Sequence, residues 1–326
     1  MKICGVILLF CLLFAGGFLI YRSVQNRSDT AVLDEQPETP AEIEGVRWNG
    51  GIYQYNEHLS NYLFLGIDKD ELNDSSAGML KAGACDAIFL VSYDRVTKAV
   101  TVISIPRDTM TEIEVFLPDG SSAGKKKDHI SLSYGYGDGR HESCYLARDA
   151  VSNLFYGLTI NGYCAMSMDG LVQIPETIGS FEAVVPNDSL AAAYPEYQKG
   201  STVEITAENV ETFVRYRDIT EAHSALARQE RQTAFLEAAL NRVESQFQQD
   251  VGIVTELYDN LSDYMVTNMS NDLFVDLLEA VYMQNEVRSL SLPGEAVEGS
   301  SYDEFHVAED ELYEMIIQEF YVNAEG

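Results

Sequence analysis

Short apolar runs alternate with amphipathic segments along most of this chain, and the alternation predicts both strands and helices. The runs at residues 62–67, 87–93 and 100–105 are rich in β-branched and aromatic residues, so we expect strands there, two or three of them buried on both faces. Weaker strand signals occur at residues 163–168, 181–186, 202–205 and 287–292. We expect these strands to form one layered sheet.

Apolar residues at helical spacing predict helices between these strands. The longest covers residues 224–247, with Phe235 and Ala239 on its apolar face. Gly157 is expected to close a helix that begins near Cys144, and Asp169 is expected to cap the start of another. The remaining predicted helices cover residues 207–213, 273–283 and 308–320. We find no internal repeat and no linker-like composition after Gly50, so the pattern predicts one α/β domain.

The N-terminal segment differs from the rest of the chain. Residues 3–21 carry no charged side chain and are mainly apolar, which is long enough to span a bilayer. A small-residue cleavage site occurs only in mid-run, at residues 15–17, so residues 1–21 are expected to form an uncleaved signal anchor. Residues 22–50 are polar and acidic and predict a linker.

The amino-acid composition and net charge limit which classes of protein fit this chain. The 326 residues are 46% hydrophobic, which allows a large core, and 52 Asp and Glu against 21 Lys and Arg give a net charge of −31. Such acidity argues against a nucleic acid as the main partner. Of the five cysteines, three lie beyond the apolar span without metal-ligand spacing, and we expect buried free thiols at Cys85, Cys144 and Cys164. The run at residues 125–127 indicates a solvated basic loop.

The strand at residues 100–105 stops at Pro106-Arg107-Asp108-Thr109, which is the first candidate for chemistry. Pro106 ends the strand, and the next two residues emerge at a sheet edge, where open α/β sheets bind ligands. The guanidinium of Arg107 suits a phosphate. An ordinary strand exit with solvated Arg107 and Asp108 is the alternative.

A second candidate is a group of basic and amide side chains. Arg215 and Arg217 are two residues apart, which would place both side chains on one face of a strand. Arg228, Arg231 and Gln232 share a face at the start of the long helix, where backbone N–H groups and the helix dipole favour anions. This arrangement predicts a phosphate or pyrophosphate pocket. Surface ion pairs are the alternative, with partners Asp218, Glu221 and Glu230.

Two aspartates accompany the early strands. Asp68 follows one strand and Asp86 opens the next, so both are expected at one rim of the sheet. Carboxylate oxygens there could hold Mg²⁺ bridging a pyrophosphate. Aspartates at strand ends are also ordinary turn residues. No phosphate-binding loop of the P-loop type occurs in the sequence.

Six ordered segments resemble the LytR-CpsA-Psr family of cell-envelope proteins, from about residue 53 to residue 240. They are Leu65–Asp68, Asp86–Leu90, Ser104–Thr109, Tyr134–Gly139, Val214–Arg217 and Arg228–Gln232. The resemblance implies a three-layer α/β/α domain with a central mixed sheet over residues 51–326, of which residues 241–326 are a C-terminal extension. It also implies a single-pass protein of the cell membrane, with the acidic linker and the domain outside the cytoplasm.

Members of this family transfer a glycopolymer from a polyprenyl-pyrophosphate carrier to a hydroxyl of peptidoglycan, using Mg²⁺. The resemblance therefore implies a transferase in which Asp68 and Asp86 hold the metal. It assigns Arg107 and Asp108 to catalysis, with Asp108 either orienting an arginine or acting as general base. The residues it assigns to the pyrophosphate head group are Arg107, Arg215, Arg217, Arg228, Arg231 and Gln232.

The sequence departs from the family pattern at three places. Many members carry Arg-Ser where this chain has Ala84-Cys85, Asp where it has Ala225, and Asn near the position of Ser131. The departures at Ala84 and Ala225 favour an alternative in which the protein binds polyprenyl phosphate without catalysis, as an envelope regulator or scaffold. A hydrolase that only releases the pyrophosphate is a further alternative.

Overall fold

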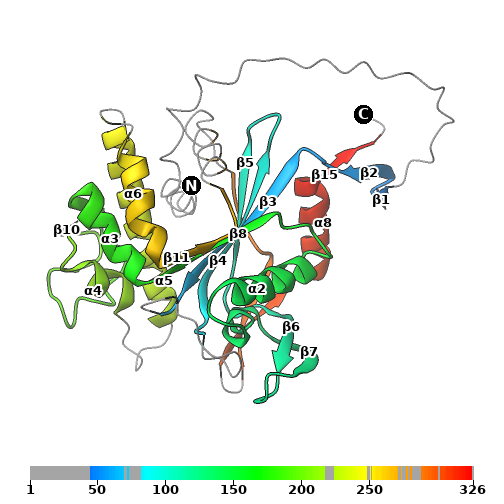
Figure 1. The fold of residues 1–326 in the computed structure, drawn as a ribbon, viewed down its shortest axis with the longest axis horizontal. Coiled ribbons are helices and arrows are strands. Elements are labelled where there is room, and N and C mark those ends of the chain that lie inside the picture. Colours follow the sequence, from blue (N-terminus) through cyan, green and yellow to red (C-terminus); the bar gives the residue numbers. More distant parts are fainter. Residues whose placement is uncertain are drawn as a thin grey trace.

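A mixed six-stranded sheet forms the centre of the structure (Figure 1). The structure is a computed structural model and describes residues 45–69, 72, 82–216, 224–247, 250, 252–270, 273, 277, 280, 288–299 and 302–324. Within these residues, the strand order of the central sheet is β11-β8-β3-β4-β5-β12. The strands are β3 (Leu59–Ile67), β4 (Cys85–Asp94), β5 (Val100–Ile105), β8 (Gly162–Ser167), β11 (Met265–Thr267) and β12 (Arg288–Ser291).

The directions of these strands determine which residues meet at one edge. β3 is parallel to β8 and antiparallel to β4, and β5 is antiparallel to β4 and parallel to β12. β3, β5, β8 and β12 therefore all end at the edge where β4 begins. The predicted rim is confirmed, because Asp68 follows β3, Arg107 follows β5, and Asp86 lies at the start of β4.

Helices cover both faces of the sheet, as the predicted layering requires (Figure 1). One core cluster joins the sheet to α3 (Asp169–Ile178), α4 (Val210–Arg215), α5 (Ser224–Phe247) and α6 (Ile253–Leu261). The other joins the opposite face to α2 (His141–Leu154) and α8 (Glu309–Phe320). Fully buried side chains such as Phe64 and Leu63 point to opposite faces, and each contributes about 1.5–3 kcal/mol by leaving water.

Residues after 240 are part of the same fold rather than an appendage. β11 and β12 are the two outer strands of the central sheet, and α8 supplies one of its covering helices. A hairpin of β13 (Gly294–Glu298) and β14 (Asp303–Val307) lies between β12 and α8 in the sequence. β15 (Tyr321–Asn323) joins β1 (Val46–Trp48) and β2 (Gly51–Tyr55) in a small sheet. The C-terminal extension thus completes the domain.

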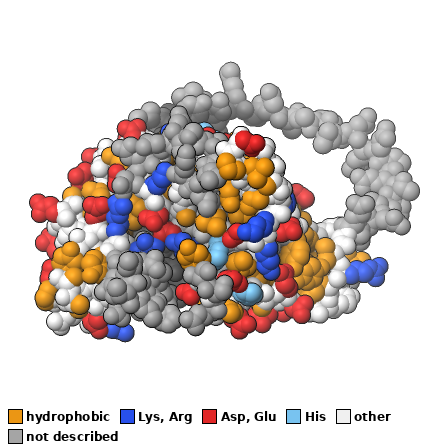
Figure 2. Space-filling model, turned by 90° about the horizontal axis from the view of Figure 1, so that it is seen from below, with side chains coloured by type: hydrophobic (Ala, Val, Ile, Leu, Met, Phe, Trp, Pro, Cys, Tyr) orange, Lys and Arg blue, Asp and Glu red, His pale blue; other side chains and the backbone are white. Residues whose placement is uncertain are grey.

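One region differs clearly from the sequence prediction. Residues 125–127, expected in a solvated loop, lie in β7 (Ser122–His129), which pairs with β6 (Met110–Phe116). The register places Lys127 opposite Glu112 and Lys125 opposite Glu114, and Lys126 contacts Asp128 at 2.9 Å. Each of the three lysines in β7 therefore lies opposite or beside a carboxylate. Figure 2 shows acidic side chains spread over one face, with Lys and Arg side chains among them.

Most other predicted elements are confirmed within a few residues. Gly157 has a φ of 86° and follows α2, so it ends that helix in the conformation that favours glycine. Asp169 is the first residue of α3 and not its cap, because Met168 occupies that position without a side-chain bond. β9 (Phe181–Val184) and β10 (Thr202–Ile205) pair as a separate ribbon. Cys85, Cys144 and Cys164 are buried free thiols, as expected.

Three predictions concern segments that the described residues cover only in part or not at all. The expected anchor at residues 1–21 and most of the linker at residues 22–50 lie outside the described residues, as does most of the helix expected at residues 273–283. In the part of the chain that the structure describes, no helix is long and apolar enough to cross a membrane.

Candidate functional site

Asp86 occupies an irregular position at the start of β4. The β3–β4 register pairs Gly66 with Ala87 and Ile67 with Cys85, so Asp86 has no cross-strand partner and forms a bulge. Bulges commonly redirect a side chain near a functional site. The Asp86 side chain is only 5% exposed although it carries a carboxylate. A buried charge in this position requires cationic or hydrogen-bonding partners.

Two arginines from distant parts of the chain supply those partners. Arg107 donates through Nη1 to Oδ1 of Asp86, and Arg228 donates through Nη2 to Oδ2. Burial raises the pKa of Asp86, the two guanidinium groups lower it, and the charge of Asp68 raises it, with a net upward shift. The carboxylate therefore brings together the predicted residues Arg107 and Arg228 at one point.

The Pro-Arg-Asp-Thr turn holds Arg107 at this point. Thr109 donates to the Pro106 carbonyl through its backbone N–H at 3.1 Å and through Oγ1 at 2.6 Å, which closes the turn. Oδ1 of Asp108 lies 3.4 Å from Nε of Arg107. The Arg107 side chain is 32% exposed, so part of its guanidinium remains accessible to a ligand. Asp108 thus has the contact expected of a residue that orients an arginine.

The first turns of α5 carry Arg228 and Gln232, as their four-residue spacing predicted. Arg228 is 12% exposed beside Asp86. Gln232 donates to the Val214 carbonyl at 3.2 Å, and its side chain lines the cavity described below. These two residues place a cation and an amide on the same side of the candidate site.

Arg231 has a different role from the predicted one. Its side chain is buried, with the residue 1% exposed, and it donates to the carbonyls of Phe213 at 2.8 Å and of Tyr216, and to Oγ of Ser189. Burial and the nearby Arg228 lower the pKa of Arg231 to about 10, which leaves it charged at neutral pH. The prediction of Arg231 as a head-group ligand is therefore wrong, because its donors are used in holding α5 to α4 and to the loop around Ser189.

The two-residue spacing of Arg215 and Arg217 predicted a strand, but Arg215 does not lie in one. Arg215 is the last residue of the helix α4, and its Nη1 donates to Glu211 one turn earlier at 2.7 Å. The helix forms because Val210, Phe213 and Val214 are buried at helical spacing. Arg217 lies outside the described residues.

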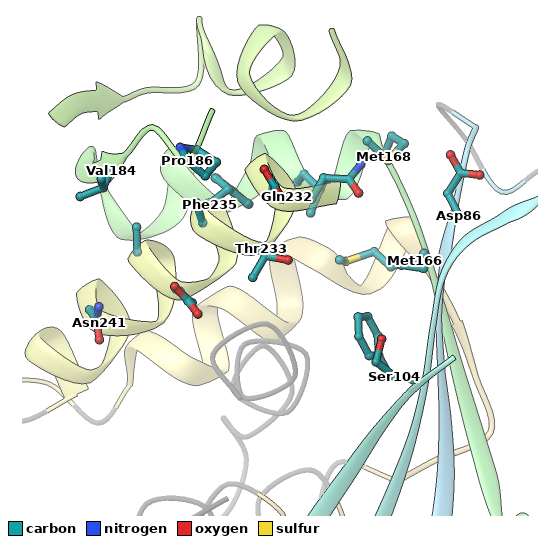
Figure 3. Close-up of a pocket in the computed structure, with 18 of the residues that line it drawn as sticks. Asp86, Ser104, Met166, Met168, Val184, Pro186, Gln232, Thr233, Phe235 and Asn241 are labelled. Atoms are coloured by element: carbon teal, nitrogen blue, oxygen red, sulfur yellow. The ribbon is translucent and has the colours of Figure 1, made fainter. Parts of the chain in front are cut away.

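A cavity of about 800 Å³ begins beside Asp86 and extends between the sheet and α5 (Figure 3). Its walls are mainly apolar, with Met166 on the sheet side and Phe235 on the helix side. Figure 3 shows Asp86 at one end, and Val184 and Asn241 toward the other. Charged side chains also line other parts of it, among them Glu182, Lys199 and Glu237. A mainly apolar cavity that begins beside two arginines held by Asp86 fits an amphiphilic ligand with an anionic head. The sequence alone does not distinguish the apolar wall residues from core residues, because both have the same composition.

Asp68 and Asp86 are the predicted magnesium ligands. Asp68 is exposed directly after β3, and its charge raises the pKa of Asp86, which places the two carboxylates within electrostatic reach. Among the described residues, no group of three or more His, Cys, Asp or Glu could hold a metal ion. Two carboxylates nevertheless suit Mg²⁺, which takes further oxygens from water and phosphates. Because both oxygens of Asp86 contact arginines, ion binding there would replace one of these contacts.

Comparisons with known proteins agree with this architecture. The model of the LytR_cpsA_psr family matches residues 19–319. A relative from Oceanobacillus iheyensis, a polyisoprenyl-teichoic acid–peptidoglycan teichoic acid transferase, is 26% identical over 323 residues, covering 94% of this chain and 89% of the relative.

Solved structures show the same fold. The crystal structure of a protein from Streptococcus agalactiae superposes with a TM-score of 0.61 at 20% identity, covering 81% of this chain and 90% of the other. The crystal structure of TagV from Bacillus subtilis gives a TM-score of 0.58 at 21% identity, covering 81% and 96%.

Proposed function

The chain belongs to the LytR-CpsA-Psr family, and we propose that it transfers a glycopolymer from a polyprenyl-pyrophosphate carrier to a hydroxyl of peptidoglycan. The observation that carries this proposal is the pair of arginines on Asp86, where a mainly apolar cavity begins. The activity named for the Oceanobacillus relative, transfer of teichoic acid from a polyisoprenyl carrier to peptidoglycan, supports the same class of reaction.

The cavity accounts for recognition of the carrier. A prenyl chain is apolar and gains free energy when it leaves water for walls such as Met166 and Phe235, at about 25 cal/mol per Å². The pyrophosphate at the end of that chain would then lie beside Arg107 and Arg228. The cavity therefore selects a long apolar group and an anionic head in the same ligand.

The arginines account for the chemistry. In the proposed reaction, an acceptor hydroxyl passes its proton to a base, for which Asp108 is the candidate, and its oxygen bonds to the polymer-bearing phosphorus. The P–O bond to the bridging oxygen of the pyrophosphate breaks, and the lipid phosphate leaves with that electron pair. Negative charge grows on that phosphate in the transition state, where fixed guanidinium groups stabilise it. Arg107 and Arg228 are fixed by Asp86, and Arg107 also by Asp108. They are thus preorganised before the substrate arrives.

Mg²⁺ is the proposed cofactor, held by Asp68 and Asp86. When bound there, the ion would supply positive charge to the pyrophosphate oxygens. The proposal is supported by the two carboxylates at one rim of the sheet and by the position of Asp86 in the lining of the cavity.

A turnover assay tests the function. The full-length protein in detergent is mixed with a synthetic polyprenyl-pyrophosphoryl oligosaccharide and a peptidoglycan oligosaccharide. We expect product only when the acceptor is present, and chelation of Mg²⁺ is expected to lower the rate by about 100-fold or more. Binding without turnover would contradict the proposal in favour of a regulator or scaffold. Release of lipid phosphate at the same rate without acceptor would indicate a hydrolase.

We further propose that residues 1–21 anchor the protein in the cell membrane, with the domain outside the cytoplasm. The uncharged apolar run at residues 3–21 supports this arrangement. N-terminal sequencing of the protein purified from membranes should find the original N-terminus, and protease added to intact protoplasts should digest the domain. A mature N-terminus beyond Gly17, or a domain that resists the protease until the membrane is broken, would contradict the anchor or the orientation.

A further inference from the structure

The backbone of the Arg107–Asp108 turn is held from two directions. On one side, the segment after β7 donates from Ser131 to the Arg107 carbonyl at 3.2 Å, and from Ile130 to the Thr109 carbonyl at 2.8 Å. On the other side, Phe305 of β14 donates its N–H to the Asp108 carbonyl at 2.8 Å. An isolated parallel bridge also joins Thr109 to Phe305. The turn is therefore clamped between the segment after β7 and the C-terminal hairpin.

β14 is itself fixed at both ends. At its start, Nε2 of His129 lies 3.0 Å from the carbonyl of Asp303, to which it can only donate. At its end, Ala308 donates to the Pro293 carbonyl at 3.1 Å, and the neighbouring Leu292 donates to Ser104 in β5 at 3.0 Å. β14 is thus bonded to β7 and, through residues 292 and 293, connected to β5, the strand that precedes Arg107.

We propose that β14 is a positioning element of the active site, and that the Phe305 N–H fixes the Asp108 carbonyl so that Arg107 stays on Asp86. Arg107 and Asp108 belong to one short turn, so a shift of its backbone moves both side chains. The C-terminal extension is then part of the catalytic machinery through its backbone. The effect on catalysis rests on the proposed function. The contact between Phe305 and Asp108 does not depend on it.

Two substitutions at Phe305 separate the effect of its backbone hydrogen bond to Asp108 from the effect of its ring. Phe305→Pro removes both the ring and the N–H, whereas Phe305→Ala removes only the ring, so the difference between them reports the hydrogen bond. Hydrogen exchange of residues 105–112, followed by mass spectrometry, is expected to be faster in the proline variant than in the alanine variant. The kcat of transfer is expected to fall about 10- to 100-fold further in the proline variant, with a smaller change in KM. Equal exchange in the two variants would overturn the proposal.

A second variant covers the case in which Phe305→Pro does not fold. His129→Asn removes the ring contact to the Asp303 carbonyl at the start of β14 and leaves the sequence of β14 unchanged. Because His129 also pairs with Met110, exchange is compared at residues 105–109, where it is expected to rise as well. Unchanged exchange in this variant would also overturn the proposal. Because exchange is measured without substrate, absence of transfer by the unmodified protein would refute the proposed function and leave the test of β14 intact.

Discussion

Replacing Asp86 by alanine is expected to lower the rate of polymer transfer about 100- to 1,000-fold, because preorganised charge at the reacting phosphate is lost. In the folded protein this one carboxylate holds Arg107 and Arg228 together. Without it, two like charges face each other and move apart. The turnover assay with full-length protein measures the loss, and thermal unfolding shows whether the variant is folded.

Two further variants make this result specific. Asp86→Asn keeps the shape of the side chain but presents an amide N–H₂ to one of the arginines, so a loss close to that of alanine is expected. Asp119→Ala changes an exposed aspartate in the β6–β7 turn and is expected to leave the rate unchanged. Full activity of folded Asp86→Ala would show that the arginine pair is not the reactive centre.

Replacing Arg231 by methionine is expected to destabilise the protein by about 3–5 kcal/mol, because buried acceptors lose their donor. Methionine keeps the unbranched stem, so the change is confined largely to the guanidinium and its bonds to Phe213, Tyr216 and Ser189. Such a loss is a large share of the about 5–15 kcal/mol that keeps typical domains folded. Urea unfolding of both proteins measures the difference.

The matched control is Arg148→Met in α2, where the half-buried arginine contacts its neighbour Asp149 and lies over the exposed ring of Tyr145. We expect a change within about 0.5 kcal/mol there. Arg231→Lys keeps the charge but cannot reach three acceptors in different directions, so an intermediate loss is expected. A stable Arg231→Met variant that no longer binds the lipid head group would restore the role that the sequence predicted for Arg231.

The sequence predicted the strand edge well because strand identity and direction are encoded locally. The apolar runs that end near Asp68 and Arg107 and begin near Asp86 needed only alternation, β-branching and Pro106 to be recognised. Their meeting at one rim followed from the topology. The meeting of Arg228 with Asp86 is a contact across the fold, which no local pattern contains.

The roles of the arginines in α4 and α5 were harder to predict. Helical spacing indicates which residues lie close together, but it does not indicate which of them face the interior. Arg231 faces the carbonyls of Phe213 and Tyr216, two acceptors that α4 leaves at its end. Arg215 was misplaced because a two-residue spacing of arginines resembles a strand, whereas the apolar residues Val210, Phe213 and Val214 follow a helix.

The hairpins were missed for a related reason. β7 is Ser-Ala-Gly-Lys-Lys-Lys-Asp-His, which has no apolar face, and its pairing with β6 defines it as a strand. β14 is short and at most half-buried, and its contact with Asp108 uses a backbone N–H that any residue but proline could supply. Side-chain patterns cannot reveal such a contact.

The contact between Asp86 and Arg228 also determines at what stage of synthesis of the chain the site can form. These residues are 142 positions apart, so a chain still being synthesised has no arginine pair until the beginning of α5 has emerged and packed on the sheet. Phe305 arrives later still, shortly before α8. A partly made protein therefore carries Asp86 and Arg107 without Arg228, and the pair of cations proposed to bind the lipid head group is complete only after α5 has been made.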